Sequence, residues 1–225
     1  MTNPPSPIRL VLFDLDGTLA DTAPDLVEAI NACLTERGMA PRPLAELRPY
    51  ISRGARGLIE RTFGFGPEHP EFEALRAEFV DRYEAGLCRH SRLFPGVPET
   101  LAGIEAAGLR WGIVTNKISR LTDPLVRLLD LDTRAACIVS GDTAARAKPH
   151  PDPIHYALER CECDAAAAVY VGDDRRDIDA GRAAGVGTLA AAYGYSVEMD
   201  NIADWRADHI IQEPIDVLRL VLPAA

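Results

Sequence analysis

The feature that most constrains the fold is an apolar stretch near the N-terminus, IRLVLF (residues 8–13), which runs directly into DLDGT. A strand with one solvent-exposed face alternates apolar and polar residues, but residues 10–13 are all apolar. Such a continuous run is typical of a strand that is buried on both faces, in the middle of a parallel sheet. We therefore expect helices to cover both sides of this strand.

Similar short apolar segments recur along the chain, at residues 109–114, 135–139, 167–171, 186–191 and 207–211. Segments that lie between them have the composition of helices, at residues 97–108, 123–131, 152–161 and 177–185. Two of these helices are expected to end at Gly108 and Gly185. Alternation of strands and helices predicts an α/β fold with a Rossmann-like, doubly wound parallel sheet.

One interval breaks this alternation, because the segment between the first and second strands is far longer than a crossover needs. Thr22, Pro24 and Asp25 form a pattern typical of a helix start. A second amphipathic helix is predicted from the apolar residues Phe72, Leu75, Phe79, Tyr83 and Leu87, which we interpret as packing residues. We predict a helical cap domain, residues 21–94, inserted into a catalytic core formed by residues 1–20 and 95–225.

Charge and composition exclude several classes of partner. The formal net charge is -10 and the sequence pI is about 5.0, so nucleic acid and anionic membranes are not expected partners. No apolar run approaches the ~18 residues of a membrane span. The N-terminal sequence MTNPPSPIRL lacks the pattern of a signal peptide, and the five cysteines are scattered. These features together favour a cytoplasmic protein.

Polar residues follow several of the predicted strands, where ligands bind in a parallel sheet. They are Asp14, Asp16, Thr115, Asn116, Asp173 and Asp174, with Lys148 in a Pro-rich loop nearby. Clustered carboxylates favour a hard divalent cation such as Mg²⁺. A lysine and a threonine beside them favour a phosphoryl group, whose oxygens accept hydrogen bonds from both.

Taken singly, these residues have simpler interpretations. An aspartate at a strand end is usually a turn or helix cap, and a lone lysine is usually surface charge. Their occurrence together, in this order and at one edge of the sheet, favours a joint chemical role.

The order DLDGT, then TN after the second strand, then KP, then GDD-x₂-D resembles the haloacid dehalogenase superfamily of aspartyl phosphatases, over essentially the whole chain. This resemblance implies a Rossmann-like core, a helical cap and a small phosphorylated metabolite as substrate. It also implies that Asp14 is the nucleophile and that Asp16 is the general acid and base. Mg²⁺ would be held by the Asp14 carboxylate, the Asp16 backbone carbonyl and Asp173.

The same resemblance gives roles to the remaining polar residues. Thr115 and Asn116 would bind phosphate oxygens, and Lys148 would neutralise charge on the nucleophile and the phosphoryl group. Asp174 and Asp177 would orient metal-bound waters or Lys148.

Within the superfamily, GDDRRDIDAGRAAG and LFPGVPETL resemble bacterial phosphoglycolate phosphatases, whereas ISRGAR and the stretch from residue 193 to 211 resemble N-acetylmuramic acid 6-phosphate phosphatases. Arg53, in ISRGAR, either meets a substrate carboxylate or is a surface arginine at a helix start. Asp16 argues against dehalogenation, because dehalogenases of the superfamily lack it. A sugar-phosphate mutase, a phosphoaspartyl receiver-like switch and a non-catalytic sugar-phosphate binder stay open as less favoured alternatives.

Overall fold

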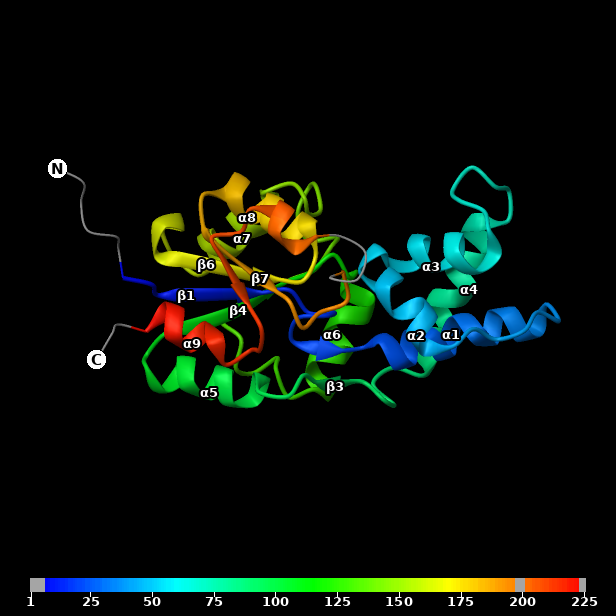
Figure 1. Cartoon of the computed structure of the whole chain (residues 1–225), viewed down its shortest axis with the longest axis horizontal. Helices are drawn as coiled ribbons and strands as arrows, with labels where there is room; N and C mark the ends of the chain where they lie inside the picture. The colour runs from blue at the N-terminus through cyan, green and yellow to red at the C-terminus, as the bar shows by residue number, and fades with distance from the viewer. Residues whose placement is uncertain (1–6, 197–200, 223–225) are drawn as a thin grey trace.

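The fold is taken from a computed structural model that describes residues 7–196 and 201–222. Residues 1–6 of the N-terminal segment, and residues 197–200 of the stretch that resembles the muramic acid phosphatases, lie outside the described residues. A parallel sheet has the strand order β5-β4-β1-β6-β7-β8 (Figure 1). Its strands are β1 (Leu10–Phe13), β4 (Arg110–Val114), β5 (Ile138–Val139), β6 (Ala168–Gly172), β7 (Gly187–Ala191) and β8 (His209–Ile211).

The first strand, β1, is central, as its continuous apolar sequence predicts. It pairs in parallel with β4 on one side and β6 on the other, and all four of its residues are buried. Val11 and Phe13 face one layer of helices, while Leu10 and Leu12 face the other. The first layer comprises α5 (Val97–Ala106), α6 (Ser119–Leu128) and α9 (Asp216–Val221), and the second comprises α7 (Asp152–Arg160) and α8 (Arg175–Ala184).

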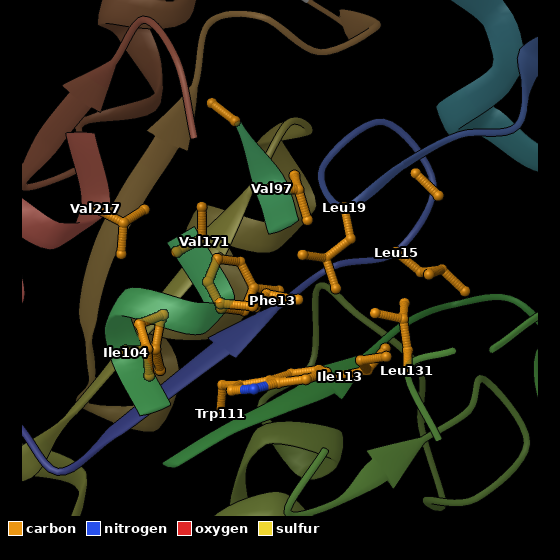
Figure 2. Close-up of a cluster of buried hydrophobic side chains, with 14 of the residues drawn as sticks. Phe13, Leu15, Leu19, Val97, Ile104, Trp111, Ile113, Leu131, Val171 and Val217 are labelled. Atoms are coloured by element: carbon orange, nitrogen blue, oxygen red, sulfur yellow. The ribbon is translucent and has the colours of Figure 1, made fainter. Parts of the chain in front are cut away.

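The first of these layers encloses the larger apolar core. Figure 2 shows Phe13, Trp111 and Val171 from three adjacent strands packed against Ile104 of α5 and Val217 of α9. This core packs one face of the sheet against α5, α6 and α9. None of the helices in the described part of the chain is both long enough and apolar enough to cross a membrane.

A helical segment lies between β1 and β4, beyond the carboxyl ends of the strands (Figure 1). It contains α1 (Ala23–Glu36), α2 (Leu44–Leu47), the 3-10 helix η1 (Arg48–Arg53), α3 (Gly54–Phe63) and α4 (Phe72–Ala85). These helices pack around their own apolar cluster, which includes Ile30, Leu58 and Phe79. The chain leaves and re-enters through two short strands, β2 (Ala20–Asp21) and β3 (Arg92–Leu93), which pair antiparallel.

Two local predictions differ from the structure. Helix α1 begins after Thr22 as expected, but the Thr22 hydroxyl donates to Asp16 instead of capping the helix. Helix α6 begins at Ser119 rather than at residue 123, and Pro124 lies inside it. The backbone N–H and the hydroxyl of Ser119 both donate to Asp142, which fixes the earlier start, and the helix omits the one hydrogen bond that proline cannot make.

Candidate catalytic site at the carboxyl edge of the sheet

A pocket of about 380 Å³ lies between the carboxyl edge of the sheet and the inserted helices. Most of the residues predicted from the sequence line it: Asp14, Asp16, Arg53, Thr115, Asn116, Lys148, Asp174 and Asp177. The exception is Asp173, which follows β6 and is completely buried behind the pocket wall. Separate loops therefore bring these side chains to one edge, as the parallel sheet predicts.

Lys148 lies at the centre of the cluster. Its buried ammonium is 2.9 Å from the Asp14 carboxylate and 2.7 Å from that of Asp177. It also donates to the Val114 carbonyl at 3.0 Å and to the Tyr170 hydroxyl at 2.7 Å. Burial disfavours the charged form of Lys148, but the two carboxylates outweigh burial and raise its pKa. The ammonium is therefore held charged beside Asp14.

The negative charge of Asp14 is partly compensated by the Lys148 ammonium. Burial raises the pKa of Asp14 to about 7; the Lys148 ammonium lowers it, and the nearby Asp177 carboxylate adds to the rise. One carboxylate oxygen of Asp14 also accepts the Leu15 backbone N–H at 2.8 Å. The remaining surface of the carboxylate faces the pocket.

Asp173 is surrounded by donors from three segments. Its carboxylate accepts from the Thr18 hydroxyl at 3.0 Å, the Tyr195 backbone N–H at 2.9 Å and the Ser52 hydroxyl of η1 at 3.3 Å. Burial, with the charges of Asp14 and Asp177, raises the pKa of Asp173 well above its ordinary value. The close approach requires glycine at position 17, where φ is +88° and a Cβ would lie 2.3 Å from a carboxylate oxygen of Asp173.

The residues present fit a hard divalent cation. Carboxylate oxygens of Asp14, Asp173 and Asp177 lie within 4.8 Å of one another. Three buried or nearly buried carboxylates face one ammonium, so negative charge is in excess, and all the candidate ligand atoms are oxygens. Asp177 has both carboxylate oxygens engaged, one by Lys148 and the other by the Asp174 backbone N–H. Lys148 and the Leu15 N–H contact the same oxygen of Asp14, so Asp14 and Asp173 are the better candidates to face an ion.

The two residues that follow β4 differ in what their side chains do. The Thr115 hydroxyl accepts the Lys117 backbone N–H at 3.2 Å, which leaves its own proton free to be donated into the pocket. The Asn116 side chain instead exchanges two hydrogen bonds of 3.0 Å with the backbone of Lys148. Asn116 therefore fixes the loop that carries Lys148.

Asp174 and Asp177 cap helix α8. The Asp174 carboxylate accepts the Arg176 backbone N–H at 2.9 Å, and the Asp177 carboxylate accepts the Asp174 backbone N–H at 3.0 Å, as in a capping box. Asp174 also forms an ion pair of 2.8 Å with Arg176, and Asp177 holds Lys148. The helix start therefore places Asp177 beside the lysine and couples α8 to the site.

Sequence reasoning missed a second buried lysine, Lys117. Its ammonium is 2.9 Å from the Asp16 carboxylate and 4.6 Å from the ring centroid of Tyr83, on α4. Asp16 also accepts the Thr22 hydroxyl. The only available sequence signal is that Lys117 directly follows Thr115 and Asn116, which is weak because a lysine after a strand is usually exposed.

The inserted helices touch the catalytic edge directly. Besides the contact of Ser52 with Asp173, the Arg176 guanidinium donates to the Ser52 backbone carbonyl. Arg53 is exposed at the pocket, with its guanidinium 5.9 Å from the Tyr50 ring centroid. Within the described residues, Arg53 forms no ion pair, so its charge is available to a ligand.

Comparison with known proteins adds an independent line of evidence. The family model described as haloacid dehalogenase-like hydrolase matches residues 11–191. The chain is 42% identical to an N-acetylmuramic acid 6-phosphate phosphatase of Pseudomonas putida, over 95% of this chain and 96% of that protein. It is 45% identical to a phosphoglycolate phosphatase of Xanthomonas campestris, over 92% and 93% respectively. A crystal structure described as a predicted phosphoglycolate phosphatase from Haemophilus somnus aligns with a TM-score of 0.83 and 29% identity, covering 95% of this chain and 97% of that one.

Proposed function

Because the chain is a phosphatase that belongs to the haloacid dehalogenase-like hydrolases, we propose that it hydrolyses a phosphate monoester through an aspartyl-phosphate on Asp14. The observation that carries this proposal is the buried Lys148, whose ammonium joins Asp14 to Asp177 beside Asp173. Burying an ammonium between carboxylates carries a desolvation cost, and neither a surface turn nor a simple helix cap requires such a group.

In the first step, an Asp14 oxygen attacks phosphorus and the bond from phosphorus to the ester oxygen breaks. Asp16 gives its proton to the departing oxygen. The Lys148 ammonium and the Thr115 hydroxyl stabilise the phosphoryl oxygens, and Asn116 keeps the Lys148 loop in place. In the second step Asp16 takes a proton from water, which attacks phosphorus, releases inorganic phosphate and restores the Asp14 carboxylate.

Mg²⁺ is the proposed cofactor, with Asp14, Asp173 and the Asp16 backbone carbonyl as its protein ligands. When bound, it reduces the repulsion between the Asp14 carboxylate and the phosphate dianion. The excess of carboxylates over ammonium groups among the buried residues supports this assignment. Asp177 would act by holding Lys148, and Asp174 by holding the start of α8.

We further propose that residues 21–94 act as a cap that selects the leaving group, because η1 and α4 supply Arg53 and Phe79 to the pocket wall. Two substrates are candidates, 2-phosphoglycolate and N-acetylmuramic acid 6-phosphate, after which the relatives are named. Both carry a carboxylate, which the free guanidinium of Arg53 suits.

Pocket size supports the larger of these two substrates. The pocket has a volume of about 380 Å³ and extends from the carboxyl edge of the sheet to the inserted helices, so it has space for a leaving group larger than glycolate. Phe79, Val80 and Ile118 line part of this space and suit the methyl groups of an acetylated lactyl sugar.

The test is phosphate release with Mg²⁺ from a panel of 2-phosphoglycolate, N-acetylmuramic acid 6-phosphate and glucose 6-phosphate. We expect turnover of a carboxylate-bearing ester, and we expect Arg53→Ala to lower its kcat/KM about tenfold relative to glucose 6-phosphate. A long-lived phosphorylated protein with no turnover would instead support a receiver-like switch, and binding without phosphorylation would support a non-catalytic binder.

A further inference from the structure

Tyr83 of α4 has a buried hydroxyl that the proposed mechanism does not use. The side chain is 1% exposed and lines the pocket, yet its hydroxyl has no hydrogen-bond partner within the described residues. Trp205 Nε1 is likewise unpaired, but it belongs to a separate cluster with Ile178 and Ala190 and does not line the pocket. A buried hydroxyl is normally paired, so an unpaired one at a pocket wall is open to an oxygen atom of a ligand or of a water that a ligand can displace.

Lys117 adds a charged donor beside this hydroxyl. Its ammonium lies 4.6 Å from the Tyr83 ring centroid, and its side chain is only 6% exposed. Burial raises the pKa of Tyr83 to about 12, although Lys117 opposes the rise, so the hydroxyl keeps its proton at neutral pH. Lys117 has three N–H groups and no acceptor. The two residues therefore offer hydrogen-bond donors on the same side of the pocket.

We propose that Tyr83 and Lys117 form a subsite that binds an oxygen atom of the leaving group, within a few bonds of the ester oxygen. This inference rests on the proposed function, in which Asp16 protonates the ester oxygen from hydrogen-bond distance. Lys117 lies 2.9 Å from Asp16, so an oxygen bound by Lys117 is close to the bond that breaks. The ammonium makes a carboxylate oxygen a stronger ligand of this subsite than a hydroxyl oxygen.

The subsite combines the two parts of the molecule. Lys117 follows β4 of the sheet, whereas Tyr83 belongs to the inserted helix α4, so both parts must be in place before the oxygen is held. Recognition of the leaving group is thereby tied to the residue that protonates it. Arg53, on η1, is a different contact, which contributes a cation from another segment of the pocket wall.

Three two-carbon esters test the subsite: 2-phosphoglycolate with a carboxylate, 2-hydroxyethyl phosphate with a hydroxyl, and ethyl phosphate with neither. The wild-type protein with Mg²⁺ is expected to favour the first two over ethyl phosphate by at least about tenfold in kcat/KM. Tyr83→Phe retains the ring and should reduce that preference by about tenfold, mainly through KM. The matched control is Tyr156→Phe, because Tyr156 lies exposed on α7 and should leave the preference unchanged.

Lys117→Gln provides a second variant, which should weaken selection of the carboxylate more than selection of the hydroxyl. A melting temperature for each variant separates loss of folding from loss of recognition. The inference is wrong if the wild type hydrolyses all three esters equally, or if neither variant alters the ratios. If no ester is hydrolysed, p-nitrophenyl phosphate included, the proposed function fails and this inference fails with it.

Discussion

Two buried lysines pair with the two aspartates of DLD, but their surroundings differ. Lys148 is 2.9 Å from Asp14, and Lys117 is 2.9 Å from Asp16. The partners of Lys148 come from the strands of the sheet, the loop after β1 and the first turn of α8, whereas Lys117 also lies against Tyr83 of the inserted helices. The proposed nucleophile, Asp14, is therefore held by contacts within the core, and the proposed proton donor, Asp16, lies where the core meets the inserted helices.

The largest expected effect is on the nucleophile. Asp14→Asn removes the attacking carboxylate, so phosphate release should fall at least about 1,000-fold for every ester. Phosphate release by Asp16→Asn should fall by a similar amount with alkyl esters. It should fall by much less with p-nitrophenyl phosphate, whose leaving group needs little protonation. Steady-state phosphate release with Mg²⁺ measures both variants.

Asp179→Asn is a suitable control for these variants, because Asp179 lies on the exposed side of α8 and, among the described residues, its only ion pair is with Arg175 at 3.6 Å. Substantial Mg²⁺-dependent turnover by Asp14→Asn would show that Asp14 is not the nucleophile. If Asp16→Asn lost the same activity with every leaving group, the proposed role of Asp16 as proton donor to the leaving group would be wrong.

The next effect compares the lysines by stability. Lys148→Met leaves Asp14 and Asp177 buried without their cation, so the free energy of unfolding should fall by about 3 kcal/mol. Lys117→Met should cost about 1 kcal/mol, because it leaves one carboxylate without its cation rather than two, and Asp16 keeps the Thr22 hydroxyl. Urea unfolding in a chelating buffer measures both. Equal losses of unfolding free energy in Lys148→Met and Lys117→Met would contradict the expected difference between the two lysine–aspartate pairs.

The cluster around Lys148, which lies in the core, could be predicted from the sequence. Continuous apolar runs identify the strands, and strand ends in a parallel sheet share one edge, so the sequence alone places Asp14, Lys148 and Asp173 together. Here the local apolar pattern is enough to predict the tertiary position. Because β1 is buried on both faces, the residues that follow it lie at the carboxyl edge of the sheet.

The cap side could not be predicted in this way. Tyr83 has the spacing of a packing residue, and it does belong to the apolar cluster of the inserted helices, but nothing local indicates that its hydroxyl is unpaired. Thr22 fits a helix cap by residue type, yet its hydroxyl serves Asp16. Lys117 depends on contacts between segments far apart in sequence, which periodicity does not encode.

Metal binding should sharpen the comparison further, because all the proposed ligands belong to the core. Saturating Mg²⁺ should raise the free energy of unfolding by roughly 2.7 kcal/mol at 100 times Kd. Asp173→Asn should abolish this gain, and in chelating buffer it should be at least as stable as wild type, because it removes a buried charge beside Asp14 and Asp177. Thermal unfolding with and without Mg²⁺ measures this. An undiminished gain in Asp173→Asn would exclude Asp173 as a ligand.

The smallest expected effect concerns an ion pair within the inserted helices, outside the pocket that holds the proposed metal site. Glu78 of α4 lies 2.7 Å from Arg37, just after α1, and this contact is the main reason that the pKa of Glu78 falls from 4.5 to about 2. Because the folded-state pKa is the lower one, the pair adds stability above pH 4.5, and that stability is lost as the pH falls towards 2. Glu78→Gln should therefore cost less than about 1 kcal/mol at pH 7, since the pair is partly exposed, and still less at pH 3. Urea unfolding at both pH values gives the difference, and a loss that does not shrink at pH 3 would mean that Glu78 stabilises the helices by packing rather than by its charge.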